Sequence, residues 1–222
     1  MGKRGQKPKG KVKIKWSSNF AYALGLLASD GNLSPDGRHI CFTTKELDQA
    51  QNFMLALDIK NKIGTKSNGI SKEKKYFIVQ FSDVLFYNFL ISVGITPSKS
   101  KTLREIKIPH ILFFDFLRGL FDGDGYTYSY FDPRWKSSFM WYIGFCSASP
   151  KFIKWLRKEI SERLGISGHV TASKPSFCLQ LKYAKSDSIK IIRSMYKKKN
   201  SIFLNRKKLK IIKMLSIVGE KI

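Results

Sequence analysis

The chain contains the stretch Leu117-Arg118-Gly119-Leu120-Phe121-Asp122-Gly123-Asp124-Gly125, and a second stretch, Ala23-Leu24-Gly25-Leu26-Leu27-Ala28-Ser29-Asp30-Gly31, aligns with it without a gap. Each stretch ends a run of mainly apolar residues that is long enough for a buried helix and that stops at an Asp-Gly turn. Small residues recur four positions apart, Gly25 with Ser29 and Gly119 with Gly123, so each helix presents a smooth ridge. We therefore expect the helices over residues 18–29 and 113–123 to pack together and to bring their C-terminal ends close.

The elements that follow these two helices occur in the same order. Alternation of apolar and polar residues predicts half-buried strands, and apolar residues three and four apart predict amphipathic helices. We predict strands over 38–44, 76–82, 126–131, 137–146, 168–173 and 177–183, and further helices over 45–57, 83–93, 151–164, 187–196 and 205–215. Both halves thus follow one order of helix, strand, strand, helix, strand, strand, helix, which predicts an α+β fold with two αββαββα repeats.

The repeats divide the chain into five parts. We predict a basic N-terminal arm over residues 1–17, a first repeat over 18–95, a linker over 96–109, a second repeat over 110–204 and a basic C-terminal helix over 205–222. The arm contains many Lys and Gly residues. We expect it to lie along phosphates, although an unstructured, solubilising end explains its composition equally well.

The composition points to a polyanionic partner. The chain has 41 Lys and Arg against 16 Asp and Glu, which gives a formal net charge of +25 at pH 7. Only seven of these basic residues lie in residues 1–15, so the repeats themselves are strongly basic. Such a charge favours nucleic acid over acidic small molecules.

Several other classes of protein do not fit the sequence. No apolar run approaches the roughly 18 residues that a membrane span needs, and residues 1–15 lack the apolar segment of a signal peptide. The histidines have no His or Cys neighbours at zinc spacing, and no Gly-rich phosphate loop is present. We expect an intracellular protein with no membrane partner, in a compartment that the sequence does not identify.

Asp30 and Asp124 are the candidate metal ligands. If the two helices pack together, both carboxylates lie where helix carbonyls already make the potential negative. Two acids in such a place favour a divalent cation with oxygen ligands, most plausibly Mg²⁺. In a very basic protein, a metal at a carboxylate pair indicates hydrolysis of phosphodiester bonds. The alternative is that both residues simply end their helices, since Asp-Gly is a common turn dipeptide.

The residues from Asn19 to about Leu215 resemble the LAGLIDADG homing endonucleases, or meganucleases, in their monomeric two-motif form. The second stretch is the closer match, because the first has Ala28 and Ser29 where the family name reads Asp and Ala. The resemblance implies two pseudo-symmetric halves that form a DNA-binding saddle of antiparallel sheets. It also implies that the penultimate motif residues, Asp30 and Asp124, bind the metal.

The same resemblance implies an intron-encoded, sequence-specific DNA endonuclease that acts as a monomer. Its partner would be a long duplex target, pseudo-palindromic or asymmetric, cut on both strands to leave short 3′ overhangs. Mg²⁺ would be the cofactor, Mn²⁺ would substitute for it, and Ca²⁺ would bind without supporting efficient cleavage. The main alternative is an RNA maturase or DNA-binding regulator that keeps the fold without cutting, and a ribosome-associated structural protein is a third reading.

The resemblance also implies basic residues near the scissile phosphates, just after the last helix of each half. Lys99 and Lys207 are the preferred catalytic candidates, with Lys101 and Arg206 as alternatives. An ammonium group there would polarise water or stabilise the transition state. Polar residues at strand ends, Thr44 in the first half and Ser147 or Ser149 in the second, are candidates for organising water.

The strand pattern also predicts which residues face DNA. Five apolar residues in each half would face the helices: Ile40, Phe42, Phe77, Val79, Phe81, Trp141, Ile143, Phe145, Leu179 and Leu181. The opposite faces and strand ends then supply the candidate DNA contacts, because a β-ribbon can enter the major groove. These candidates are Arg38, His39, Thr43, Tyr76, Gln80, Arg134, Lys136, Tyr142, His169, Lys174, Gln180 and Lys182. An error of one residue in strand parity would exchange the two sets.

Overall fold

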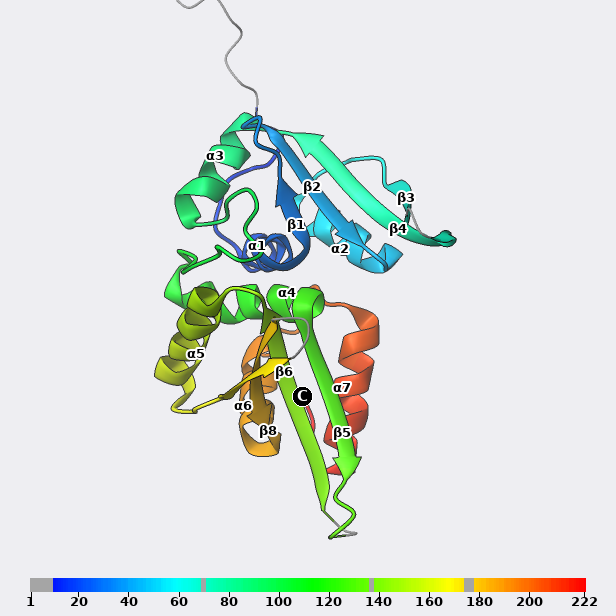
Figure 1. Ribbon diagram of the computed structural model, residues 1–222, viewed down its shortest axis with the longest axis vertical. Coiled ribbons are helices and arrows are strands. Elements are labelled where there is room, and N and C mark those ends of the chain that lie inside the picture. Colours follow the sequence, from blue (N-terminus) through cyan, green and yellow to red (C-terminus); the bar gives the residue numbers. More distant parts are fainter. Residues whose placement is uncertain (1–9, 69–70, 136–137, 174–177) are drawn as a thin grey trace, which may run out of the picture.

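The computed structural model describes residues 10–68, 71–135, 138–173 and 178–222. Two helices, α1 (Ser18–Asp30) and α4 (Phe113–Asp124), lie side by side at the centre of the molecule. One four-stranded antiparallel sheet lies on each side of this pair (Figure 1). The two halves of the chain therefore meet at the helices whose sequences align.

The first half has one sheet and two further helices. After α1 come β1 (Gly31–Leu33), β2 (His39–Thr44), α2 (Leu47–Leu57), β3 (Gly64–Asn68), β4 (Ser71–Ser82) and α3 (Val84–Val93). The strand order across the sheet is β1-β2-β4-β3. Helices α2 and α3 pack against this sheet.

The second half repeats this topology. A short 3₁₀ turn, η1 (His110–Leu112), leads into α4, followed by β5 (Gly125–Phe131), β6 (Phe139–Ser147), α5 (Pro150–Leu164), β7 (His169–Ser173), β8 (Cys178–Ala184), α6 (Lys185–Met195) and α7 (Asn205–Ile217). The strand order β5-β6-β8-β7 is that of the first sheet. The prediction of an α+β fold with two matching repeats is confirmed.

Helices α1 and α4 end where a glycine lets the chain turn sharply. Gly31 and Gly125 both have extended backbones, and their N–H groups still bond to the last turn of the helix. A β-carbon at Gly31 would lie 2.6 Å from the Leu27 carbonyl oxygen, and one at Gly125 would lie 2.5 Å from that of Phe121. Each Asp-Gly pair thus leads directly into the first strand of its sheet.

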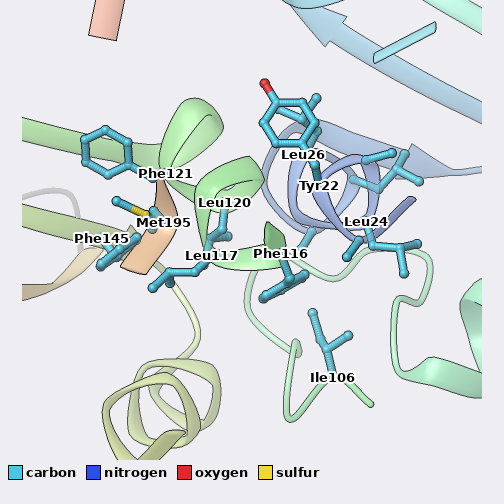
Figure 2. Close-up of a cluster of buried hydrophobic side chains, with 14 of the residues drawn as sticks. Tyr22, Leu24, Leu26, Ile106, Phe116, Leu117, Leu120, Phe121, Phe145 and Met195 are labelled. Carbon is cyan, nitrogen blue, oxygen red and sulfur yellow. The ribbon is translucent and has the colours of Figure 1, made fainter. Parts of the chain in front are cut away.

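The two central helices touch through their backbones. A β-carbon at Gly25 would lie 2.2 Å from the carbonyl oxygen of Phe116, and one at Gly119 would lie 2.0 Å from that of Tyr22. Figure 2 shows how the larger side chains of both helices, such as Leu24 and Leu120, fill the core around this contact. The prediction that the glycine ridges pack together is confirmed.

The strands have the predicted parity. Eight of the ten residues expected to face the helices are buried, and Phe77 and Leu179 are half-buried. Strand β3 was absent from the predictions for individual strands, because Gly64–Asn68 has no apolar alternation. In α2, Leu47 is exposed, while Phe53 is buried and stacks on Phe42.

Part of the N-terminal segment is anchored to the first repeat. The N–H groups of Lys11 and Val12 donate to the carboxylate of Asp83 at 2.6 and 2.8 Å, and Trp16 packs edge-on against Phe20. The predicted arm over residues 1–17 therefore includes an ordered part, and residues 1–9 lie outside the described residues. Within the described residues, no helix is long and apolar enough to cross a membrane.

Candidate active site

Asp30 and Asp124 are the last residues of α1 and α4, where Asp30 is half-buried and Asp124 is exposed. The Asp30 carboxylate lies against α4, because a β-carbon at Gly123 would be 2.6 Å from its Oδ2. Burial, and then the charge of Asp124, raise the pKa of Asp30 to about 6. Burial likewise raises the pKa of Asp124 above its ordinary value. The charge of Asp124 thus acts on Asp30 across the contact between the two helices.

A buried lysine binds the C-terminal end of each motif helix. Lys99 Nζ donates to the carbonyl oxygens of Gly31 at 2.6 Å and Ser29 at 3.2 Å. Lys207 Nζ donates to those of Phe121, Gly123 and Gly125 at 2.6, 2.9 and 2.6 Å. A cation in this place complements the negative end of the helix dipole.

The two lysines are poorly hydrated, and their charges face the carboxylates. Burial lowers the pKa of Lys207 to about 8, against the opposing effects of Asp122, Asp30 and Asp124. Burial also lowers the pKa of Lys99, against the effects of Asp124 and then Asp30. Both ammonium groups therefore add positive charge beside the carboxylate pair.

Two hollows open beside the helix ends, and each combines residues of both repeats. One, of about 300 Å³, is lined by Ser29 of the first repeat, Lys99 of the linker and Asp124 of the second repeat. The other, of about 240 Å³, is lined by Asp30 of the first repeat, Asp122 of the second repeat and Lys207 of α7. We call them the Lys99 hollow and the Lys207 hollow. Each lysine binds carbonyls at the end of one motif helix and faces the carboxylate of the other motif helix.

The carboxylates fit a hard divalent cation. Throughout the described ranges, no three or more His, Cys, Asp or Glu side chains are grouped so that they could hold a metal ion. The protein would therefore supply two carboxylates, and water or a bound phosphate would supply the other oxygen ligands that Mg²⁺ or Ca²⁺ requires. A cation would relieve the repulsion that raises the pKa of Asp30.

The other candidates for the active site lie in different environments. Arg206 lines the Lys207 hollow but is paired with Glu46, with Nη2 2.6 Å from Oε1, and Lys101 is exposed. Thr44 is buried and donates to Gln49, while Ser149 caps α5 and donates to the carbonyl of Leu103. Ser147 lines the Lys99 hollow.

The predicted DNA contacts of the first half lie on the outer face or at the tip of the first sheet. Thr43 and Tyr76 line the Lys207 hollow, and Gln80 is exposed on β4. Arg38 and His39 both pair with Asp36 in the turn between β1 and β2. These side chains follow one sheet face from its tip to the hollow.

In the second half, Tyr142, Gln180, Lys182 and His169 lie on the outer face of the second sheet. Arg134, at the tip of the β5–β6 hairpin, pairs with Asp132 at 2.8 Å. Lys136 and Lys174 lie outside the described residues.

Asp122 is a buried acid that the sequence analysis did not select. Its Oδ2 accepts hydrogen bonds from Tyr22 Oη and from the Leu204 N–H, both at 2.8 Å, while Oδ1 is buried and has no partner in the described part of the chain. Burial raises its pKa to about 6. Its counterpart in the first motif is Ala28, and this mismatch in the alignment is the signal that singles it out.

A larger cavity lies elsewhere. It has about 790 Å³ and is lined by residues after α6 and along α7, among them Lys197, Lys199 and Lys208. It contains neither motif aspartate. The two smaller hollows at the helix ends are therefore the candidate active site.

No protein-family model and no curated protein matches the chain by sequence. Solved structures do match it. The LAGLIDADG homing endonuclease I-LtrWI bound to target DNA is 12% identical, with a TM-score of 0.57 over 90% of each chain. The homing endonuclease I-DmoI, in complex with DNA and Mn, is 15% identical, with a TM-score of 0.51 over 82% of this chain and 97% of that one.

A third similar structure is full-length DUF199/WhiA from Thermatoga maritima, which is 14% identical with a TM-score of 0.57. The match covers 93% of this chain but 62% of WhiA, so the chain spans less than two thirds of that protein. The N-terminal LAGLIDADG domain of WhiA also matches, at 16% identity and a TM-score of 0.53. At these identities the similarity concerns the fold, and the chain has the two-repeat LAGLIDADG fold.

Proposed function

We propose that the protein is a sequence-specific endonuclease that cuts both strands of duplex DNA with the help of a divalent metal, Mg²⁺ in the cell, and leaves short 3′ overhangs. The observation that carries this proposal is the crossed pairing of charges, Asp124 with Lys99 and Asp30 with Lys207, in two hollows related by the repeat. Two equivalent hollows suit two scissile phosphates, one on each strand. A protein that only binds DNA has no use for a pair of carboxylates at this interface.

The protein residues have distinct roles in this proposal. Asp30 and Asp124 hold the metal, which when bound activates water and stabilises charge on the leaving oxygen. Lys99 and Lys207 stabilise charge that develops on the phosphate, and their bonds to backbone carbonyls just after the helix ends hold them in place before the substrate arrives. The outer faces of the two sheets bind the target, and one chain supplies both halves, so the active form is a monomer.

A second candidate is a DNA-binding protein or RNA maturase of this fold that does not cut. The similarity to the WhiA LAGLIDADG domain supports this second candidate, because the fold also occurs as one domain of a longer protein that is not described as an endonuclease. The two candidates share the basic sheets and differ in the use of the carboxylates.

Selection from a randomised duplex DNA library tests the proposal. One portion of the library is incubated with the protein in Ca²⁺, and the bound DNA is recovered. A second portion is incubated with the protein in Mg²⁺, and DNA with newly cut ends is recovered. We expect one sequence to dominate both pools, with cut ends that carry short 3′ overhangs and that disappear with chelator. Specific binding without cut ends would favour the second candidate, and cutting in the presence of chelator would contradict the metal site.

A further inference from the structure

Four tyrosines form a continuous stack on the outer face of the second sheet. The rings of Tyr128 and Tyr142 lie 4.9 Å apart and within 9° of parallel. Tyr130 stacks at 6.4 Å on both of them, and Tyr126 stacks on Tyr128 at 6.1 Å. Tyr128 and Tyr130 remain 36% and 45% exposed. We call these four residues the tyrosine stack.

The strand register builds this stack. Residues Tyr126, Tyr128 and Tyr130 alternate along β5, so all three point to the same face, and Tyr142 lies directly opposite Tyr128 on β6. Gly144 lies opposite Tyr126, where a β-carbon would come within 2.4 Å of the tyrosine ring. Because that glycine has no side chain, the Tyr126 ring extends across β6, and its hydroxyl lies 3.2 Å from Gln180 Oε1 on β8.

The first sheet is polar at the equivalent position. Gly31 pairs with Phe42 and Phe42 with Val79, as Gly125 pairs with Phe145 and Phe145 with Leu181. One residue further along β1 and β5, the residues paired across the strands are Asn32, Cys41 and Gln80 in the first sheet. The corresponding residues in the second sheet are Tyr126, Gly144 and Lys182. Two faces that occupy equivalent places in the fold thus offer different chemistry.

The rings of the stack are nearly parallel, so they turn their faces toward one another. C–H edges and hydroxyl groups then contribute to the surface that the stack offers. Burial raises the pKa of Tyr126, Tyr128 and Tyr142, so these three hydroxyls stay protonated and neutral. Lys182 and His169 follow in the same row as Tyr126 and supply polar groups that can meet phosphates.

The major groove of B-DNA offers one apolar group to such a surface, the C5-methyl of thymine. The major groove of an RNA helix is too deep and narrow for side chains to read. On the basis of the proposed function, we infer that the second sheet recognises a thymine-rich half-site by contact between the tyrosine stack and thymine methyl groups. The first sheet recognises its half-site by hydrogen bonds from residues such as Asn32 and Gln80.

Replacement of thymine by deoxyuracil removes only the methyl group and keeps base pairing. Target DNA from the selection is prepared with this replacement in either half, and its Kd is measured in Ca²⁺ so that no strand is cut. We expect replacement in one half to weaken binding about fourfold for each contacted methyl, and replacement in the other half to change the Kd less than twofold.

Two variants assign this effect to the stack. Tyr128→Ser and Tyr142→Ser should bind the parental target more weakly and lose the response to deoxyuracil, while Tyr128→Phe should keep it. Thermal unfolding checks that each variant folds. Equal responses in both halves, no response in either half, or an unchanged response in the serine variants would overturn the inference.

A further comparison separates failure of the inference from failure of the proposed function. If the selection recovers no duplex sequence, the proposed function fails and the inference falls with it. If a target is recovered and cut, but single-stranded RNA competes for binding in a way that depends on Tyr128, the stack is a platform for unpaired bases and the thymine reading is wrong.

Discussion

The lysines of the two hollows reach the same position from different backbones. Lys99 lies in the irregular turn that follows α3, and its side chain meets two carbonyls. Lys207 lies in the first turn of α7 and meets three. The Lys207 hollow also contains Arg206 and Asp122, and the residue that corresponds to Asp122 in the Lys99 hollow is Ala28. The repeat thus preserves the place of the ammonium group relative to the helix end and leaves the segment that carries it free to differ.

The largest effect that we expect concerns the carboxylates. Asp30→Asn and Asp124→Asn should each abolish linear product, because each removes a metal-binding charge while folding and DNA binding persist. Nicked and linear products of the selected target are scored separately with Mg²⁺. Nicks on opposite strands in the two variants would show that the hollows work independently, and no nicks in either would show one shared centre. Full linear product from either variant would exclude the proposed site.

Equivalent substitutions in the two central helices should lower the free energy of unfolding to a similar extent. A β-carbon at Gly25 or Gly119 would overlap a backbone carbonyl of the opposite helix to a similar extent. We expect Gly25→Leu and Gly119→Leu each to lower the free energy of unfolding by about 3 kcal/mol or more. Denaturant titration measures this, with Gly64→Leu as the control, because a β-carbon at Gly64 would meet nothing closer than 3.8 Å. Parental stability of either motif variant would contradict the close contact.

Replacement of either lysine should slow cleavage to a similar extent, but the two replacements should differ in their effect on the free energy of unfolding. Lys99→Met and Lys207→Met should each slow cleavage about 100-fold, as the loss of one stabilising donor does. Lys207→Met should cost more stability, about 1–3 kcal/mol, because three carbonyls lose their donor. The exposed Lys101 gives a matched control, Lys101→Met. Equal rates for Lys101→Met and Lys99→Met would shift the role to Lys101.

The charge of Asp30 should oppose folding when no metal is bound. Its pKa is about 6 in the folded protein against 3.8 ordinarily, so the folded state holds the proton more tightly between about pH 4 and pH 6. Stability therefore falls as pH rises through this window, and Asp30→Asn removes that loss. We expect the metal-free variant to exceed the parent by about 1 kcal/mol at pH 7, an advantage that disappears near pH 4.

Mg²⁺ provides the counter-test for Asp30. Because a ligand that binds only the folded state stabilises it, Mg²⁺ at pH 7 should raise the Tm of the parent and leave that of Asp30→Asn nearly unchanged. Equal shifts in the two proteins would place the metal elsewhere.

The smallest effect should come from the N-terminal residues. Because Lys11 and Val12 are anchored on Asp83, a deletion should stop at residue 9 to leave the first repeat undisturbed. Affinity for duplex DNA should fall steeply with salt, and deletion of residues 1–9, which carry four basic side chains, should reduce the logarithmic slope by less than about four. A flat salt response in the parent would contradict the polyanion-binding surface.

Local patterns were sufficient to predict most of the fold. The apolar runs ending at Asp30 and Asp124 predicted both central helices, and alternation in stretches such as Ile40–Phe42 predicted which strand faces are buried. The close approach at Gly25 and Gly119 followed from the spacing of small residues. Strand β3 was missed because it is short and polar, and its place in the sheet depends on pairing with β4.

The site was harder to predict because it depends on contacts between distant segments. The two aspartates were chosen from the motif, but the crossed pairing of Lys99 with Asp124 requires the packing of α1 against α4, which no local pattern reports. The ion pair between Glu46 and Arg206 joins the repeats in the same way. The tyrosine stack did have a local signal, the alternation of Tyr126, Tyr128 and Tyr130, although strand twist and Gly144 decide how the rings meet.

The crossed hollows also mean that neither repeat is a complete unit of chemistry. A fragment that ends in the linker would keep Asp30 and Lys99 but would lose the partner of each. The two parts of a chain divided in the linker, expressed as separate polypeptides, should regain a functional centre only when α1 packs against α4, so that activity depends on assembly. For the same reason, a hybrid that replaces one whole repeat with that of another LAGLIDADG protein has to preserve the glycine contact before any choice of target sequence matters.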